Sequence, residues 1–158
     1  MGSLKKLRPA LRELVVDDIA GNMQHTRRCR GIAPLTVDDV KEMAKCPRVT
    51  IGAHSDCHNI LTQIDDEAMR ASVTQSKKLL ESWIGRSVKY FAFPNGDFDE
   101  RVVSAVKTAG FEVAATSTGR PWLRDQDLFE LPRVAVGRYD SQERFKLMMA
   151  TGNRRVWR

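Results

Sequence analysis

The sequence predicts an α/β fold in which a parallel sheet forms part of a (β/α) barrel. Strand-like and helix-like segments alternate along the chain, an order typical of parallel sheets. The chain has 158 residues, whereas a complete barrel of this kind takes about 250 residues. A charged fraction of 29% with few prolines and glycines is typical of a folded chain. We therefore expect a partial or truncated barrel with an N-terminal helical extension.

Two helices are predicted before the first strand. Leucines, Val15 and Ile19 recur at spacings of three and four residues, which predicts an amphipathic helix over about 4–19. Thr36 with Asp39 three residues later resembles a capping box and predicts a helix that continues to about Lys45.

Three more helices are expected at about 65–84, 97–109 and 141–150. The first begins with three acidic residues, which a helix N-terminus favours, and Gly85 ends it. Asp97 and Glu100 are expected to form the capping box of the second, which Gly110 closes.

Four strands complete the pattern, at 48–53, 88–93, 112–116 and 131–136. In parallel α/β folds, functional residues gather where the strands end at their carboxyl side. The segments that follow these strands are therefore the first place to look for a site.

The net charge of +6 is concentrated at the two ends of the chain. Residues 1–34 are expected to form a helical extension and basic linker, 35–150 the α/β domain, and 151–158 a basic tail. The arginines of 27–30 and 154–158 could attract nucleic acid, but solvated ends are the simpler interpretation because no aromatic residues alternate with them. Trp122 and Trp157 could stack on sugars or serve only in packing.

Three cysteines without a Cys-x-x-Cys spacing indicate neither a disulfide framework nor a zinc knuckle, and Cys57 is expected to be a small apolar filler. No signal peptide and no membrane-spanning segment is evident, so a cytoplasmic location is expected.

His54 and His58 follow the first predicted strand directly. If the chain turned into a helix there, residues four apart would lie on one face and both imidazoles could bind one divalent ion. Ser55 stands where zinc proteases with the His-Glu-x-x-His motif have glutamate, so the motif does not favour that class. Two hydrogen-bonded surface histidines remain the alternative.

Two ordered motifs resemble the polysaccharide deacetylase family (NodB-like and chitin deacetylase-like proteins, carbohydrate esterase family 4). The first is Ile51–Thr62, which contains His-Ser-Asp-Cys-His, and the second is Tyr90–Asp99, which contains Phe-Pro-Asn-Gly-Asp. The similarity extends from about Leu35 to Val136.

The resemblance implies a metal-dependent hydrolase that removes acetyl groups from a carbohydrate. His54 and His58 would be metal ligands, and zinc is the expected metal. Ser55 would support the turn between them, and the backbone N–H of Asn95 would face the developing oxyanion. An acetylated polysaccharide or oligosaccharide would be the substrate. A plain strand-to-helix turn is the alternative for Pro94–Gly96.

The chain departs from the family in the residues that would complete the reaction. The family's Thr-Phe-Asp-Asp-Gly motif, which supplies the base and third metal ligand, is absent, as is the late Leu-x-x-His motif that supplies the acid. Candidates for the third ligand are Asp56 and Asp18. Ala92 replaces an arginine of the family, and Arg133 is a candidate electrostatic substitute.

Three functions follow as hypotheses. The first is a deacetylase-like protein that is inactive as an isolated chain and needs a partner chain for the missing barrel strands. The second is a non-catalytic module that binds carbohydrate or another protein. The third, a basic nucleic-acid-binding module, is the least favoured.

Overall fold

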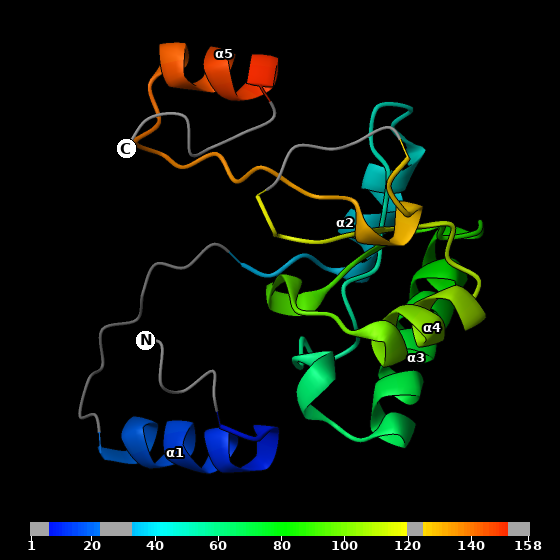
Figure 1. Cartoon of the computed structure of the whole chain (residues 1–158). Helices are drawn as coiled ribbons and strands as arrows, with labels where there is room; N and C mark the ends of the chain where they lie inside the picture. Colours follow the sequence, from blue (N-terminus) through cyan, green and yellow to red (C-terminus); the bar gives the residue numbers. More distant parts are fainter. Residues whose placement is uncertain (1–6, 23–32, 120–124, 152–158) are drawn as a thin grey trace.

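The structure is a computed structural model, and it describes residues 7–22, 33–119 and 125–151. Five α-helices and two strands follow one another along the described chain (Figure 1): α1 Pro9–Asn22, α2 Val37–Lys45, α3 Asp66–Ile84, β1 Tyr90–Ala92, α4 Glu100–Thr108, β2 Val113–Ala115 and α5 Gln142–Thr151. Short 3₁₀ helices lie at Leu61–Gln63, Pro94–Gly96 and Leu128–Glu130. The predicted α/β class and its parallel sheet are confirmed.

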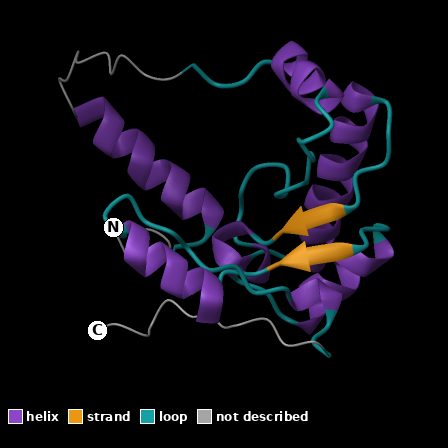
Figure 2. Cartoon of the chain, turned by 90° about the horizontal axis from the view of Figure 1, so that it is seen from above, coloured by secondary structure: helices purple, strands orange, loops and turns teal. Residues whose placement is uncertain are grey.

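The strands β1 and β2 are parallel, as Figure 2 shows, with Phe91 opposite Ala114. Single parallel bridges join Ala53 to Phe91 and Leu131 to Ala115. Four extended segments therefore lie side by side, in the order of Ala53, β1, β2 and Leu131.

The outer two segments are shorter than the predicted strands 48–53 and 131–136. Because Ala53 is opposite Phe91, the residues before Gly52 face chain that precedes the start of β1. Because Leu131 is opposite Ala115, the residues after Leu131 face chain beyond the end of β2. The positions of both segments were predicted, but their lengths were not.

The helices α3 and α4 pack side by side (Figure 1). Their side chains cover one face of the sheet. Their apolar faces meet Phe91 and Ala114 in a core of fully buried side chains, which includes Met69, Val73, Val88, Phe93, Val102 and Val106. Leu80 and Ile84 of α3 also pack against this core, so one face of this helix is apolar along its length.

Helix ends follow the expected chemistry with one exception. The Thr36–Asp39 capping box and the left-handed Gly85 are present as predicted. The prediction of Asp97 as the cap of α4 is wrong: the Asp99 carboxylate accepts from Val102 N at 2.8 Å. Asp97 instead accepts from Asn95 Nδ2 at 2.7 Å.

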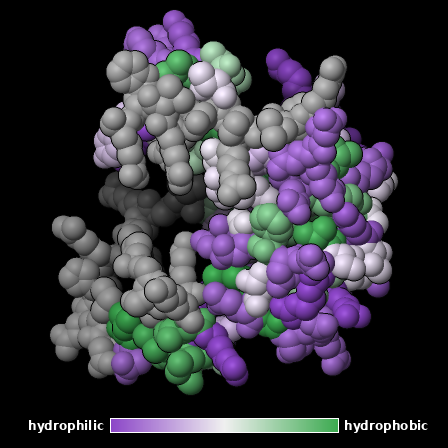
Figure 3. Space-filling model, in the orientation of Figure 1, coloured by the Kyte–Doolittle hydropathy of each residue, from purple (hydrophilic) through white to green (hydrophobic). Residues whose placement is uncertain are grey.

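Helix α1 is present, but its leucines are not buried as an amphipathic helix would bury them. Leu11 and Leu14 are 50% and 66% exposed, and an apolar patch covers this helix in Figure 3. Among the described residues, no helix combines the length and apolar character that crossing a membrane requires. The basic segments 27–30 and 154–158, Trp122 and Trp157 lie outside the described residues.

Candidate functional site

The candidate site lies where the four parallel segments end at their carboxyl side. His54 follows the Ala53 segment, Pro94–Gly96 follows β1, Ser117 follows β2 and Arg133 follows the Leu131 segment. Parallel pairing brings these ends to one edge of the sheet. The residues predicted from both sequence motifs are therefore placed on the same edge.

His54 is oriented by the neighbouring strand. Its Nδ1 lies 2.6 Å from the carbonyl oxygen of Ala92. Since a carbonyl oxygen only accepts hydrogen bonds, Nδ1 must carry the proton and donate it. The lone pair of the neutral ring is then on Nε2, and a backbone carbonyl that fixes the other nitrogen is typical of a metal-binding histidine.

A loop, and not a helix, places the His58 ring against the His54 ring. Their ring centroids are 4.8 Å apart and the planes meet at 75°. Ser55 and His58 both adopt left-handed backbone conformations, with φ of 63° and 54°. Non-glycine residues rarely adopt such values, which cluster at functional sites. The loop therefore brings the two imidazoles together at a cost in backbone strain.

Ser55, expected to support this turn, has a buried Oγ for which the described residues supply no hydrogen-bond partner. The backbone N–H of Asp56 donates to Ser72 Oγ at 3.1 Å, which fastens the loop to α3.

The described residues contain no cluster of three or more metal-binding side chains. The carboxylate of Asp56 contacts the thiol of Cys57, and this hydrogen bond raises the pKa of Cys57. Cys57 is exposed, so the expected apolar filler role is wrong. Asp18 lies exposed on α1.

Helix α1 nevertheless reaches the histidine loop. A cavity of about 470 Å³ is lined by His58 and Asn59 from the loop and by Arg12, Glu13 and Asp17 from α1. The acidic residues that share a cavity with His58 are therefore Glu13 and Asp17, and not the predicted Asp18.

The turn after β1 has an unusual backbone. Asn95 has a φ of 58°, and its side chain donates to Asp97. Gly96 has a φ of 81°, and a Cβ there would lie 2.5 Å from the Cβ of Ser117. The loops after β1 and β2 thus touch at a glycine that no larger residue could replace without movement.

Arg133 holds the loop after β2. Its Nε donates to the carbonyl of Thr116 at 2.9 Å and its Nη2 donates to Ser117 Oγ at 3.1 Å. The guanidinium is thereby fixed to the loop that contacts Gly96. Sequence analysis identified Arg133 but not Ser117, whose contacts come from segments 16 and 21 residues away.

A family model described as polysaccharide deacetylase matches residues 19–114, more than half of the chain. A protein of Bacillus subtilis (strain 168) named "Putative polysaccharide deacetylase YxkH" is 26% identical over 102 residues, which cover 65% of this chain and 36% of that protein. The fold is similar to that of Streptococcus pyogenes deacetylase PplD in complex with acetate, with a TM-score of 0.68, 20% identity, and coverage of 76% of this chain and 53% of that one.

It is also similar to BC0361, a polysaccharide deacetylase from Bacillus cereus, with a TM-score of 0.65, 23% identity, and coverage of 73% and 36%. The chain thus spans about a third to a half of the length of these relatives. The family resemblance seen in the sequence is confirmed, and the chain belongs to the polysaccharide deacetylase family.

Proposed function

We propose that this chain is the histidine-bearing part of a metal-dependent carbohydrate deacetylase. The reaction would hydrolyse an N-acetyl or O-acetyl group on a polysaccharide or oligosaccharide. The observation that supports it best is the pair His54 and His58, in contact at the edge where the Pro94–Gly96 turn also lies. Family membership supports the substrate class.

A divalent ion, most simply zinc, would be held by His54 Nε2 and by a ring nitrogen of His58. Such an ion would polarise the acetyl carbonyl and acidify a bound water. Catalytic zinc sites use three protein ligands, and the described residues supply no third ligand beside the pair. The residues present therefore fit two of the three positions.

The protein's own groups would orient the substrate. The fixed Nδ1–H of His54 keeps the Nε2 lone pair directed outward. The Asn95 backbone N–H would stabilise the developing oxyanion, and the left-handed turn held by Asp97 sets its direction. Arg133 would add positive charge near this edge while it holds Ser117 in place.

A carboxylate-bearing segment would complete the site. We propose that it lies on barrel strands absent from this chain, supplied by a partner chain or by a longer form of the protein. The fold here would then be a partial barrel. Without the general base, the rate should be lower by about 10² to 10⁴, so we expect the isolated chain to release little acetate.

The test is complementation. The chain is mixed with a polypeptide that contains the family's Thr-Phe-Asp-Asp-Gly strand, and acetate release from acetylated chitooligosaccharides is measured with zinc and with a chelator. We expect release that needs zinc, the added strand and His54, with His54→Ala as the inactive variant and Cys57→Ser as the matched control. A complex that forms but releases no acetate would overturn the enzymatic proposal.

A non-catalytic carbohydrate-binding module is the second candidate, favoured by the lack of a third ligand among the described side chains. It predicts oligosaccharide binding that is insensitive to zinc and to His54→Ala.

A further inference from the structure

A polar cavity lies between α3 and α4, and it includes none of the residues proposed for deacetylation. Its volume is about 540 Å³, within the range of about 300 to 1,000 Å³ typical of small-molecule sites. Seven residues line it: Arg70, Thr74, Arg101, Ser104, Ala105, Thr108 and Ala109. The two charged residues among them are both arginines.

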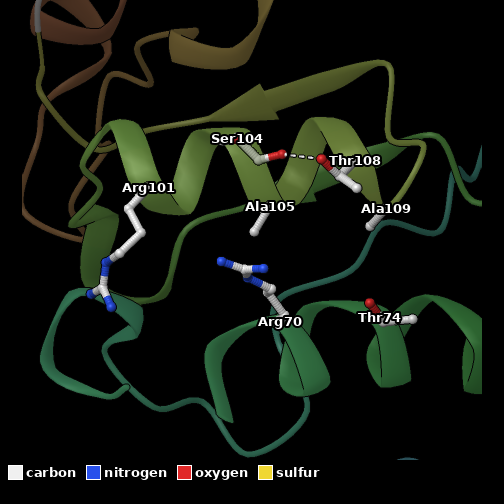
Figure 4. A pocket seen from close by; sticks show the side chains of 7 residues that line it. All are labelled: Arg70, Thr74, Arg101, Ser104, Ala105, Thr108 and Ala109. Carbon is white, nitrogen blue, oxygen red and sulfur yellow. Dashed lines mark hydrogen bonds between the residues drawn. The ribbon is translucent and has the colours of Figure 1, made fainter. Parts of the chain in front are cut away.

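The two arginines come from different helices, and only the Arg70 guanidinium extends between them, whereas the Arg101 side chain turns toward the loop before α3. Figure 4 shows the Arg70 guanidinium extending from α3 toward Ala105 on α4, with Arg101 at one end of the groove. The small Ala105 and Ala109 leave space between the helices. The hydroxyls of Thr74 and Ser104 add hydrogen-bonding groups from both sides, whereas Thr108 Oγ1 donates to the Ser104 carbonyl.

Arg101 is a fixed charge. Its Nη1 donates to Asp66 Oδ1 at 2.6 Å and to the Ile64 carbonyl at 3.1 Å, and its Nη2 faces the carbonyls of Leu61 and Thr62. Asp99 lies 3.8 Å from its Nε. These contacts hold the guanidinium in place while its side chain remains 33% exposed.

Arg70 is the more available cation. Its Nη2 donates to Asp66 Oδ2 at 3.3 Å, and its side chain is 67% exposed. An exposed ion pair of this kind contributes little. Each oxygen of the Asp66 carboxylate accepts a hydrogen bond from one of the two arginines, so both arginines pair with the same carboxylate.

We propose that this groove binds a phosphate-type oxyanion carried by a small polar molecule such as a sugar. Guanidinium groups match tetrahedral oxyanions through paired N–H donors. The Thr74 and Ser104 hydroxyls would donate to the remaining oxygens or to sugar hydroxyls. The cavity is larger than one phosphate ion requires, which favours a ligand with an attached polar group.

The test is an amide NMR titration of the full chain at constant ionic strength with inorganic phosphate, glucose 6-phosphate and glucose. We expect saturable shifts near Thr74 and Ala105 with both phosphates, tighter binding of the sugar phosphate, and none with glucose. Arg70→Gln should weaken binding about tenfold or more, since it removes charge-assisted hydrogen bonds. Arg86→Gln, on an exposed arginine outside this groove, is the matched control.

Shifts that do not saturate, or that persist unchanged in Arg70→Gln, would overturn the proposed site. Equal affinity for phosphate and glucose 6-phosphate would overturn the sugar-bearing ligand. Ser104→Ala should weaken sugar phosphate binding without altering the free energy of unfolding, which separates a contact to the ligand from a structural role.

Discussion

The two faces of the sheet differ in how completely they are covered. Phe91 and Ala114, which point toward α3 and α4, are 2% and 0% exposed. On the opposite face, Tyr90 is 45% exposed and its strand neighbour Ala92 is only partly buried. Alternate residues of a strand point to opposite faces, so the same short strands contain both environments.

We assign the stability of the chain mainly to the covered face and the proposed function to the less covered face. The covered face contains most of the buried apolar core and should stabilise the chain on its own. The less covered face adjoins the edge with His54 and the Asn95 turn. In the partial barrel proposed above, this face would point into the barrel, since it is the one that α3 and α4 leave open.

The largest expected effect is a difference in stability loss between substitutions on the two faces of the sheet. Phe91→Ala should lower the free energy of unfolding by about 3 to 5 kcal/mol, because it removes a ring packed against Phe93 and Phe111. Tyr90→Ala, one residue earlier, should cost about 1 kcal/mol or less because the ring is half-exposed. Urea unfolding of both variants measures this, and similar losses would show that the faces are equally packed.

A smaller effect should appear where the site loops touch. Gly96→Ala places a methyl group against Ser117 in a left-handed conformation and should cost about 1 to 3 kcal/mol. Gly85→Ala has a similar positive φ but no atom within 4 Å of the added Cβ, so it should cost only about 1 kcal/mol. Thermal unfolding compares them, and equal losses would show that the Gly96–Ser117 contact is unimportant.

The helix that leaves the site edge offers a third comparison. Asp99→Ala removes the cap of α4 and should cost about 1 kcal/mol. Asp97→Ala should cost less but disturb the Asn95 turn, which amide NMR shifts at Asn95 and Gly96 would detect. If Asp97→Ala is the more destabilising variant, Asp99 is not the effective cap.

The smallest effect is a pH dependence on the covered side. The hydrogen bond from Arg101 lowers the pKa of Asp66, and that from the Val88 N–H lowers the pKa of Glu81. A carboxyl group whose folded pKa is depressed stabilises the fold above its unfolded pKa of about 4, and this stability is lost as pH falls through the folded value.

Stability should therefore decline below about pH 4, and Asp66→Asn should flatten that decline. Asp38→Asn, which alters only a surface pair with Lys41, is the control. Urea unfolding between pH 7 and pH 2 measures both, and an unchanged pH profile in Asp66→Asn would contradict the role of Arg101.

The helices were predictable because their ends have local signals. Thr36 with Asp39 and the left-handed Gly85 act within one turn of the chain, so their spacing alone was sufficient. The prediction that Asp97 caps α4 was wrong because Asp97 and Asp99 are both plausible caps. The turn at Asn95 engages Asp97 and leaves the cap to Asp99, a choice that spacing does not determine.

Part of the site was also predictable, because some of its residues are close together in the sequence. His54 and His58 are near neighbours in sequence, although the chain joins them by a strained loop and not by a helix. The contacts of Ser117 with Gly96 and Arg133 depend on the order of the parallel segments. Such long-range contacts have no local pattern from which they could be recognised.

Zinc titration of the full chain by isothermal calorimetry tests the metal half-site most directly. We expect one weakly bound zinc ion per chain, with affinity reduced at least about tenfold by His54→Ala and by His58→Ala. Cys57→Ser should leave the affinity unchanged, since the thiol is not among the proposed ligands. Zinc affinity that survives the loss of either histidine would contradict the proposed metal site.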